Sequence, residues 1–401
     1  MPNIKFSMKQ FLKKNNVVCT VNAALKAALQ EGKSALDLNI YRFLARKKGI
    51  DLIPHEKMAH EIKNRLSRLG ITPQPKSKGN LHVFIAFSLN NWEGILPLSL
   101  APFGRVTVFE WQSLGFDDKL KVFLKQRDLM NRAMLDEFIK ANTQQKIDVV
   151  VGYLCGYNTD PQILKRMKEE GAVIVNFCWD DKLFYRGKRI AGRWYGPAAL
   201  ASTVDLNLTN APDSCIKYMV DGGLSIFWPE AACPEKHRPY DLPFEFDVSF
   251  VGQKYGWRPK FIDKLLENGI IISCFGKGWD NGPLSDEEMV KLYSRSRINL
   301  GFAGVGHSKK LMCLKGRDFE VPMSGGLYLT QDNPELSLVY EVGREIVTFK
   351  DEHDCLKKIQ WLLANPAEAD KIRKAGYKRA LSDHTWEKRF TDIFTMAGIL
   401  L

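Results

Sequence analysis

Short apolar runs alternate with amphipathic segments through most of the chain. Between residues 80 and 230 the runs are rich in Val, Ile, Leu and Phe, and the segments between them are amphipathic or polar. Continuous apolar runs between helices are typical of a parallel sheet that is covered on both faces. Residues 80–230 are therefore predicted to form one Rossmann-like domain. Its predicted strands are 81–89, 105–111, 146–154, 172–179, 200–208 and 224–229.

The alternation stops at residues 230–245, which contain three prolines and no periodic apolar positions. It then restarts, which predicts an interdomain linker followed by a second Rossmann-like domain at 245–384. The predicted strands of this domain are 247–252, 270–276, 297–303, 327–330 and 344–349, and 385–401 is predicted to be a last amphipathic helix. Ligands of such sheets bind beyond the carboxyl ends of the strands, so a binding cleft is expected at the boundary of the two domains.

Residues 1–79 have a different pattern, which predicts a basic extension of short helices. One helix is predicted to begin at Ser34, in a capping box, and 54–70 has an apolar face on a basic helix. Residues 1–80 hold 16 Lys and Arg against 5 Asp and Glu, whereas the rest of the chain is nearly neutral. This charge predicts an acidic partner bound through residues 1–72: nucleic acid, an anionic membrane surface or an acidic glycan. A solvated basic face that only aids solubility is the alternative.

Composition and motifs disfavour several classes of protein. The chain has 45% hydrophobic and 26% charged residues, which is ordinary for a globular protein of two or three domains. Neither a membrane-spanning run nor a secretory signal is expected, and the eight cysteines are scattered, so we expect a cytoplasmic protein with reduced thiols. The GxGxxG fingerprint in its usual context, the Walker motif and the GxSxG elbow are absent from the sequence. Hydride transfer, P-loop chemistry and α/β-hydrolase chemistry are therefore not expected.

Three successive strand ends in the second domain carry residues suited to a sugar nucleotide. Glycines let the backbone approach a ligand, cations offset the charge of a diphosphate, and a carboxylate can bind ribose hydroxyls. An aromatic ring in such a loop can stack on a base. The three loops supply, in order, Gly252 and Arg258; Gly276, Gly278 and Trp279; and His307, Lys315, Arg317, Glu320, Ser324, Gly325 and Gly326.

The stretches VSFVGQKYGWRPKFIDKL, FGKGW, LKGRDFEVPMSGGLYLT and EVGREIVTF occur in this order between residues 245 and 392. Together they resemble the CgeB-like glycosyltransferases, which are relatives of the large retaining GT-B group. NFCWDDKLF at 176–184 is similar to a segment of the N-terminal domain of the same group. The resemblance implies a GT-B fold, with two Rossmann-like domains and a cleft between them, and an enzyme that transfers a sugar from a nucleotide-sugar donor.

The resemblance also implies roles for individual residues. Glu320 matches the second glutamate of a Glu-x7-Glu motif, which engages ribose, whereas Met312 replaces the first, so the sugar-contacting role of that glutamate is missing or moved. Lys315 and Arg317 match positions that neutralise the donor diphosphate. The loop 276–279 matches the base-binding region, and the terminal helix is expected to cross back to the N-terminal domain.

The expected enzyme is a hexosyl or pentosyl transferase that needs neither a metal nor a cofactor and uses a donor of the UDP type. The sequence has no D-x-D triplet, and Lys315 and Arg317 would stabilise the leaving diphosphate. Asp180 and Asp181 follow a predicted strand, so either can be the base that activates an acceptor hydroxyl. Further candidates are His307 for catalysis and Asn91 and Trp92 for acceptor binding.

The acceptor is expected to be a glycan, a small molecule or a modified base in DNA. The alternative to an enzyme is a catalytically idle GT-B-like scaffold whose basic N-terminal helices bind nucleic acid or an anionic surface. Met312 at the position of the first glutamate supports that alternative, and the set formed by Lys315, Arg317 and Glu320 argues against it.

Overall fold

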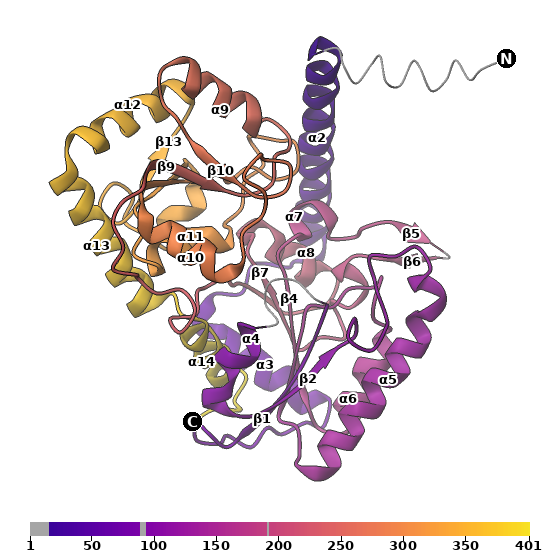
Figure 1. Cartoon of the computed structure of the whole chain (residues 1–401). Helices are drawn as coiled ribbons and strands as arrows, with labels where there is room; N and C mark the ends of the chain where they lie inside the picture. Colours follow the sequence, from indigo (N-terminus) through magenta and orange to yellow (C-terminus); the bar gives the residue numbers. More distant parts are fainter. Residues whose placement is uncertain (1–15, 89–93, 191) are drawn as a thin grey trace. The chain divides into compact units, whose positions relative to one another are not determined.

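A computed structural model describes residues 16–88, 94–190 and 192–401, and the chain divides into two compact α/β units (Figure 1). Among the described residues, unit 1 comprises 16–35 and 234–384, and unit 2 comprises 36–233 and 385–401. The passage from unit 2 to unit 1 at residue 234 lies within the proline-containing segment 230–245.

Unit 2 is built on a six-stranded parallel sheet with the order β2-β1-β3-β4-β7-β8. The strands are β1 (Leu81–Phe87), β2 (Gly104–Glu110), β3 (Val149–Gly152), β4 (Val173–Cys178), β7 (Leu206–Thr209) and β8 (Ser225–Phe227). The chain moves from β1 to β2 in one direction across the sheet and then to β3 on the other side of β1. In sheets of this kind, ligands bind at such a switch point, beyond the carboxyl ends of the strands.

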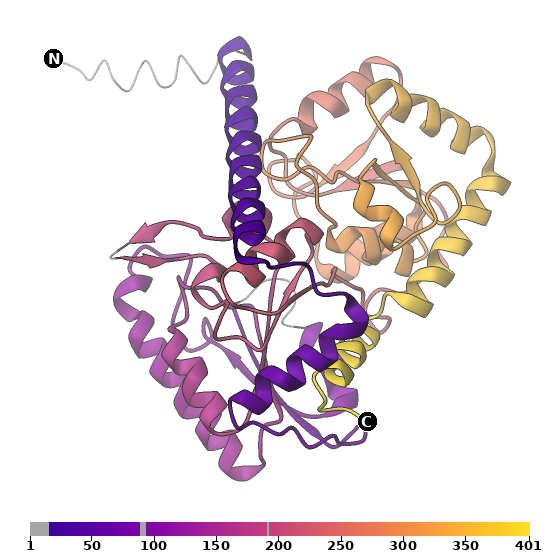
Figure 2. The same cartoon turned by 180° about the vertical axis from the view of Figure 1, so that it is seen from behind.

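Each face of the unit 2 sheet has its own core. Alternate residues of a strand point to opposite faces, so Val83 and Ile85 contribute to one core and Phe84 contributes to the other. Figure 2 shows the sheet from behind, with α3 over it. The first core is completed by α3 (His55–Arg68), α4 (Leu96–Leu100) and α14 (Trp386–Met396), and the second by α5 (Phe123–Gln144) and α6 (Pro161–Glu169). Short elements complete the unit: α7 (Asp181–Phe184), β5 (Arg189–Ile190), β6 (Arg193–Trp194) and α8 (Cys215–Val220).

Unit 1 contains a five-stranded parallel sheet with the order β10-β9-β11-β12-β13. The strands are β9 (Phe246–Val251), β10 (Ser273–Phe275), β11 (Ser296–Leu300), β12 (Tyr328–Gln331) and β13 (Val347–Phe349). The helices are α9 (Arg258–Glu267), α10 (Asp286–Arg295), α11 (Gly316–Met323), α12 (Glu352–Ala364) and α13 (Pro366–Asp383). The side chains of Ser285 and Asp351 accept backbone hydrogen bonds and thereby fix the starts of α10 and α12. The switch point of this sheet lies between β9 and β11.

The N-terminal part of the chain differs from the separate extension of short helices that the sequence predicted. A single helix, α2 (Asn16–Lys48), continues through Ser34, whose side chain is buried, so Ser34 does not begin a helix. In α3 the apolar face Met58, Ile62 and Leu66 belongs to the first core of unit 2. Residues 36–79 are therefore an integral part of unit 2.

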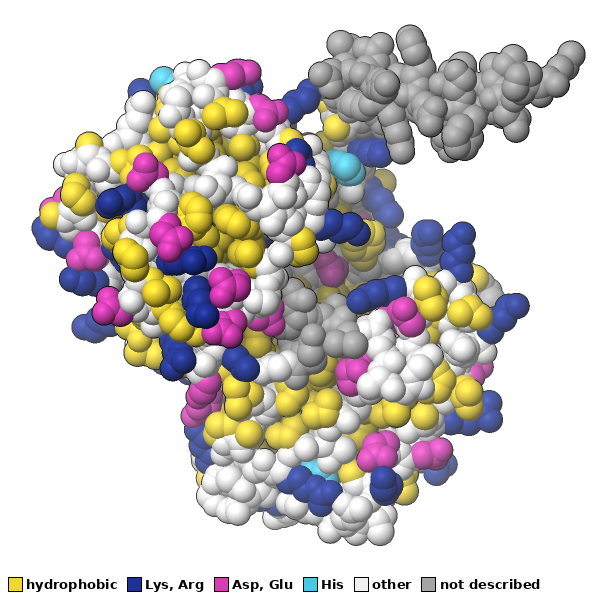
Figure 3. Space-filling model, viewed as in Figure 1, with side chains coloured by type: hydrophobic (Ala, Val, Ile, Leu, Met, Phe, Trp, Pro, Cys, Tyr) yellow, Lys and Arg dark blue, Asp and Glu magenta, His cyan; other side chains and the backbone are white. Residues whose placement is uncertain are grey.

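The C-terminal segment returns to unit 2, where Trp386 and Phe390 of α14 pack in the same core as α3. None of the helices in the described ranges is long and apolar enough to cross a membrane. Seven cysteines, Cys155 and those that follow it in the sequence, are free thiols, and all of these except Cys155 are buried. On the face drawn in Figure 3, basic and acidic side chains are interspersed over both units, consistent with the near-neutral charge of residues 81–401.

Candidate functional site

In unit 1, the loops that follow β9 and β11 lie side by side at the switch point of the sheet. A Cβ atom on Gly256 would lie 3.5 Å from the carbonyl oxygen of Gly306, so the two loops are in contact. Arg258 begins α9 directly after the first loop, and Arg317 lies in the first turn of α11 after the second. The topology therefore brings together two cations that are 59 residues apart in the sequence.

Arg258 interacts with a second cation, Arg317, and forms no ion pair with a carboxylate among the described residues, although its guanidinium lies 4.4 Å from the centre of the Tyr255 ring. Arg258 is only 5% exposed, and its one hydrogen bond, from Nη1 to the carbonyl oxygen of Gln253, is long at 3.4 Å. Burial, followed by repulsion from Arg317, lowers the pKa of Arg258 to about 10. The Nε atom of Arg317 is buried and has no acceptor among the described residues. Buried charges are normally paired, so this pair is suited to a bound anion.

The surroundings of Arg317 keep it charged. Burial lowers the pKa of Arg317, but the tyrosines and carboxylates around it outweigh burial and raise the pKa above its ordinary value. Asp318 is buried beside it and accepts hydrogen bonds from the Lys315 backbone N–H at 2.7 Å and from the Tyr328 hydroxyl at 2.9 Å. Burial raises the pKa of Asp318 to about 6.

Lys315 and Glu320 lie at the N-terminal half of α11 together with Arg317. Lys315 is the residue that caps the helix, and its Nζ lies 3.0 Å from Cys313 Sγ. Glu320 is one turn beyond Arg317, and residues three apart lie on the same face of a helix. Its Oε1 is 3.9 Å from Nε2 of His237. The structure thus places three of the predicted site residues on or beside α11, and Arg258 of α9, also predicted, interacts with one of them, Arg317.

His307 lies in the same loop that leads to α11. Its backbone N–H donates to Gln30 Oε1 of α2 at 2.9 Å, and its ring Nδ1 is buried without a partner in the described part of the chain. The neighbouring Ser308 hydroxyl donates to Glu31 Oε1 at 2.5 Å. The described N-terminal part of unit 1 therefore holds this loop in place.

The glycine loop after β10 has a structural explanation. A Cβ atom on Gly276 would lie 2.4 Å from the carbonyl oxygen of Gly252, so glycine is needed where the two loops meet. The indole N–H of Trp279 donates to that same carbonyl at 2.8 Å, and Lys254 Nζ lies over its ring at 4.8 Å. Gly278 has φ of +92°, which favours glycine. These contacts hold Trp279 within the protein, so the predicted stacking on a base would need the ring to leave them.

Ser324, Gly325 and Gly326 lie at the C-terminal end of α11, away from Lys315 and Arg317. The N–H groups of Gly325 and Gly326 donate to the carbonyls of Pro322 and Val321, both at 2.9 Å, and Gly325 has φ of +72°. A Cβ atom on Gly326 would lie 2.7 Å from Asn299 Nδ2. Gly325 therefore ends the helix α11, and Gly326 lies where the packing leaves no room for a Cβ atom. The sequence prediction that these residues approach a ligand gains no support from this placement.

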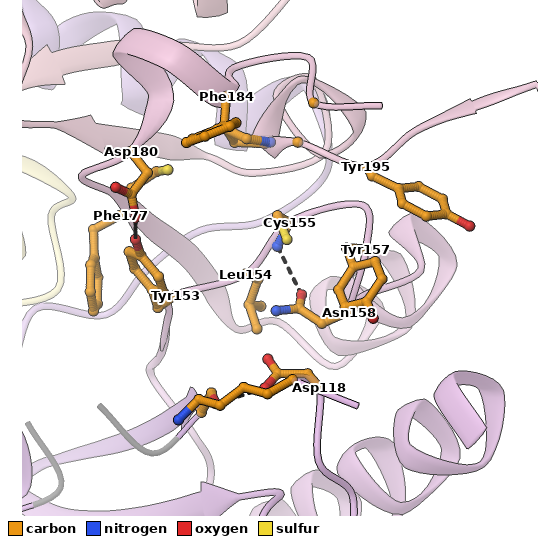
Figure 4. Close-up of a pocket in the computed structure, with 16 residues that line it drawn as sticks. Asp118, Tyr153, Leu154, Cys155, Tyr157, Asn158, Phe177, Asp180, Phe184 and Tyr195 are labelled. Atoms are coloured by element: carbon orange, nitrogen blue, oxygen red, sulfur yellow. Dashed lines mark hydrogen bonds between the residues drawn. The ribbon is translucent and has the colours of Figure 1, made fainter. Parts of the chain in front are cut away.

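Unit 2 contains a pocket of about 430 Å³ beyond the carboxyl ends of β1, β3 and β4 (Figure 4). Its walls are mainly aromatic and apolar and include Tyr153, Tyr157, Phe184 and Tyr195. Two carboxylates, Asp118 and Asp180, also line it. In Figure 4 they lie on opposite sides of the pocket, with Leu154 and Cys155 between them.

The two carboxylates of the pocket have different environments. Asp180 Oδ2 accepts a hydrogen bond of 2.8 Å from the Tyr153 hydroxyl and is otherwise exposed. Asp118 Oδ1 accepts from the Ser88 hydroxyl at 3.0 Å, and burial raises its pKa. Both carboxylates can therefore accept a hydrogen bond from a hydroxyl group bound in the pocket.

Asp181 does not belong to this pocket. It is fully buried, and its Oδ2 accepts a hydrogen bond of 2.8 Å from the Tyr218 hydroxyl. Burial raises its pKa to about 6. Asp181 is therefore an interior residue at the start of α7 and cannot contact an acceptor. The prediction that Asp181 can act as the base is wrong. Asn91 and Trp92 lie outside the described residues.

Sequence reasoning missed most of the unit 2 pocket. Asp118 follows β2 by eight residues and Tyr157 follows β3 by five, so their places after predicted strands could have indicated them. Tyr153 directly follows β3 but falls inside the predicted strand 146–154. Tyr195 follows the short strand β6, which was not predicted from the sequence.

The comparisons with known proteins bear on the fold and on the C-terminal region. Residues 258–395 match the family described as glycosyl transferase-like. No curated protein matches the sequence. Sucrose-phosphate synthase from Thermosynechococcus elongatus aligns with a TM-score of 0.56 at 10% identity, over 79% of this chain and 98% of its own.

Two further structures align over 79% of this chain. An α-glucosyltransferase in complex with UDP-glucose and DNA containing an abasic site gives a TM-score of 0.53 at 11% identity and is covered over 99% of its length. Anabaena HepE in complex with UDP gives a TM-score of 0.51 at 10% identity and is covered over 98%. The fold of this chain is thus GT-B, as the sequence predicted, and its residues 258–395 match a glycosyltransferase-like family.

Proposed function

We propose that this protein is a glycosyltransferase, as the CgeB-like resemblance implies, and that it moves a sugar from a UDP-type donor to a hydroxyl group of an uncharged acceptor. The observation that carries the proposal is the pair Arg258 and Arg317. A buried guanidinium, Arg258, and a half-buried one, Arg317, interact at the switch point of the unit 1 sheet; Arg258 has no carboxylate partner among the described residues, and the Nε of Arg317 is buried and unpaired there. A diphosphate is an anion of the right charge and shape for two such groups.

The donor site supplies the electrostatic part of the reaction. When the bond between the sugar and the diphosphate breaks, negative charge grows on the leaving oxygen, and fixed cations that face it lower the barrier. Arg258, Arg317 and Lys315 provide these cations, so the proposed transfer needs neither a metal nor another cofactor. Glu320, on the same face of α11 as Arg317, would accept hydrogen bonds from the ribose hydroxyls.

A UDP donor is favoured by the structural neighbours. The α-glucosyltransferase is described with UDP-glucose and Anabaena HepE with UDP. Both proteins share the fold of this chain, and on that basis we propose that the donor of this chain is also a UDP-sugar.

The unit 2 pocket favours an uncharged, ring-bearing acceptor such as a sugar. Its aromatic walls can pack against the apolar faces of a sugar ring, and its two carboxylates can accept hydrogen bonds from hydroxyl groups. Lys119 is the one Lys or Arg among the described residues that line the pocket. A nucleic-acid acceptor would bring phosphates towards Asp118 and Asp180, which would repel them.

Asp180 is the proposed base. It is the carboxylate of the pocket that is exposed, and Tyr153 fixes one of its oxygens by a hydrogen bond. The other oxygen is then free to accept the proton of the attacking hydroxyl. General base catalysis of this kind typically contributes on the order of 100-fold to 10,000-fold in rate.

A panel of UDP-sugars and neutral sugar acceptors, with release of UDP as the readout, tests the proposal. Asp180→Asn is expected to lower turnover by on the order of 100-fold or more and to leave UDP affinity unchanged. The neighbouring variant Asp181→Asn is a matched control that should retain turnover. If no nucleotide diphosphate binds the folded protein, the idle scaffold with a nucleic-acid-binding N-terminus becomes the better account.

A further inference from the structure

The helix α2 carries a row of exposed apolar side chains along one line. Leu25, Leu29, Leu36 and Phe43 are between 58% and 65% exposed, and Ile40 is 38% exposed. At 3.6 residues per turn, these five side chains lie within about 60° of one another around the helix axis, over about 27 Å of its length. Single exposed apolar residues are ordinary, whereas a contiguous exposed apolar row is typical of a surface that binds another protein or a membrane. We call these five residues the α2 stripe.

The opposite face of α2 already has its partner. Tyr41 and Ala45 are each 4% exposed and pack with Tyr185 and Ala201 in unit 2. The stripe is therefore a second apolar face, and the fold of unit 2 does not account for it.

Cations flank the α2 stripe on both sides. Lys26 and Lys33 lie along one edge of the stripe, Arg42 and Arg46 lie along the other, and all four are exposed. The acidic residues of α2 face away and are engaged elsewhere. Glu31 accepts a hydrogen bond from Ser308, and Asp37 forms ion pairs with Arg186 and Lys217.

We propose that the α2 stripe docks onto the surface of an anionic phospholipid bilayer. A helix with an apolar row between two rows of Lys and Arg lies in the plane of a membrane interface, where the apolar row enters the acyl boundary and the cations meet lipid phosphates. The stripe lies on a helix that is not able to cross the bilayer, so the contact is with one surface. The sequence before α2 adds four lysines and no acidic residue in positions 1–15.

The charge pattern favours a bilayer over a second copy of α2 and over a nucleic acid. If two copies of α2 paired through the stripe, Lys26 and Lys33 would meet only cations from the partner helix, and like charges at the edges of paired helices are destabilising. A nucleic acid would be held by the flanking cations, but its phosphates would lie against five apolar side chains that offer a single aromatic ring, Phe43, for stacking.

Vesicle sedimentation with the full chain tests this proposal without any measurement of activity. The wild type is expected to bind vesicles of phosphatidylcholine mixed with phosphatidylserine, more weakly as salt rises, and to bind phosphatidylcholine alone poorly. The triple variant Leu29→Asn, Leu36→Asn and Phe43→Asn should lower partitioning on the order of 100-fold. Its matched control is Leu266→Asn, Ile271→Asn and Leu338→Asn, which changes side chains of similar exposure in unit 1 and should bind as the wild type does.

A charge variant keeps the test decisive if the triple variant fails to fold. Neutralising Lys26 and Lys33 to Gln should lower partitioning roughly 30-fold, from about 1 kcal/mol per cation, whereas Lys357→Gln with Lys378→Gln should not. Binding that is equal for the stripe variant and the wild type would overturn the proposal. So would a dimer in solution that the stripe variant dissociates, or DNA binding that the stripe variant abolishes, since these results would assign the stripe to a second copy or to nucleic acid.

Discussion

Replacing Arg258 by methionine is expected to stabilise the ligand-free protein and to weaken its binding of UDP. Methionine keeps an unbranched side chain of similar length and removes the charge. In the ligand-free protein, burial and repulsion from Arg317 disfavour the charged form of Arg258, so removing that charge relieves both. In the proposed complex the same charge faces the diphosphate, so its removal has the opposite effect.

The size of the stability gain is bounded by the pKa of Arg258. That pKa falls from 12.5 to about 10, and each pKa unit corresponds to about 1.36 kcal/mol, so keeping Arg258 charged costs about 3 kcal/mol. Burial is the largest cause and repulsion from Arg317 the second. The variant is therefore expected to gain about 1 kcal/mol in the free energy of unfolding, with 3 kcal/mol as the upper bound. Loss of a charge-assisted hydrogen bond of about 1.5–3 kcal/mol should weaken UDP binding roughly 10-fold to 100-fold.

Urea unfolding without ligand and calorimetric titration with UDP measure the two effects separately. Arg373→Met is the matched control, because Arg373 is also largely buried but has a carboxylate partner, Asp370, at 3.2 Å. That control should lose stability and bind UDP unchanged. If Arg258→Met destabilised the ligand-free protein and left UDP affinity intact, Arg258 would be a structural residue and the proposed diphosphate site would be refuted.

Three further predictions concern residues whose roles the structure redefines. Burial raises the pKa of Asp181 to about 6, above that of an unfolded chain, so its contribution to stability is lost as the pH rises from about 4 to above 6. Asp181→Asn should therefore gain about 3 kcal/mol relative to the wild type between these pH values in urea unfolding; a pH-independent difference would contradict this. Gly326→Ala should cost about 1–3 kcal/mol in unfolding free energy, because its Cβ would overlap Asn299 and Val321. Its UDP affinity in calorimetry should be unchanged; weaker binding at full stability would restore Gly326 as a ligand contact. Trp279→Phe should cost about 1 kcal/mol through the lost bond to Gly252, measured by thermal unfolding, and a large fall in UDP affinity at unchanged stability would show that the indole stacks on the base instead.

The sequence predicted the two sheets well because their strands are buried on both faces. A strand covered on both sides must be apolar at nearly every position, so a run such as 172–179 is visible without an alignment, and it contains β4. The N-terminal region was predicted less well. The Ser34 capping pattern predicts the start of a helix. In the structure the residues before Ser34 are also helical, and Ser34 is a buried residue in the middle of α2.

The charged residues of the candidate site were easier to find than their roles. Lys315, Arg317 and Glu320 are close in sequence, so one short helix necessarily brings them together. Arg258 joins them only because β9 and β11 are neighbours in the sheet, which the order of strands in the sequence does not reveal. Asp180 and Asp181 are adjacent, and the start of α7 turns one outward and the other into the interior.

The glycines of the LKGRDFEVPMSGG stretch show why a motif alone did not locate the donor. The sequence does not distinguish a glycine that lets the backbone approach a ligand from a glycine that ends a helix. In this chain Gly325 takes the left-handed conformation that follows a helix, and Gly326 fills a gap too small for a Cβ atom. Both requirements hold whether or not a ligand is bound, so the presence of these glycines is explained by the fold. What points to a ligand is the other end of α11, where burial and repulsion from Arg317 disfavour the charged form of Arg258 and where Nε of Arg317 has no acceptor among the described residues.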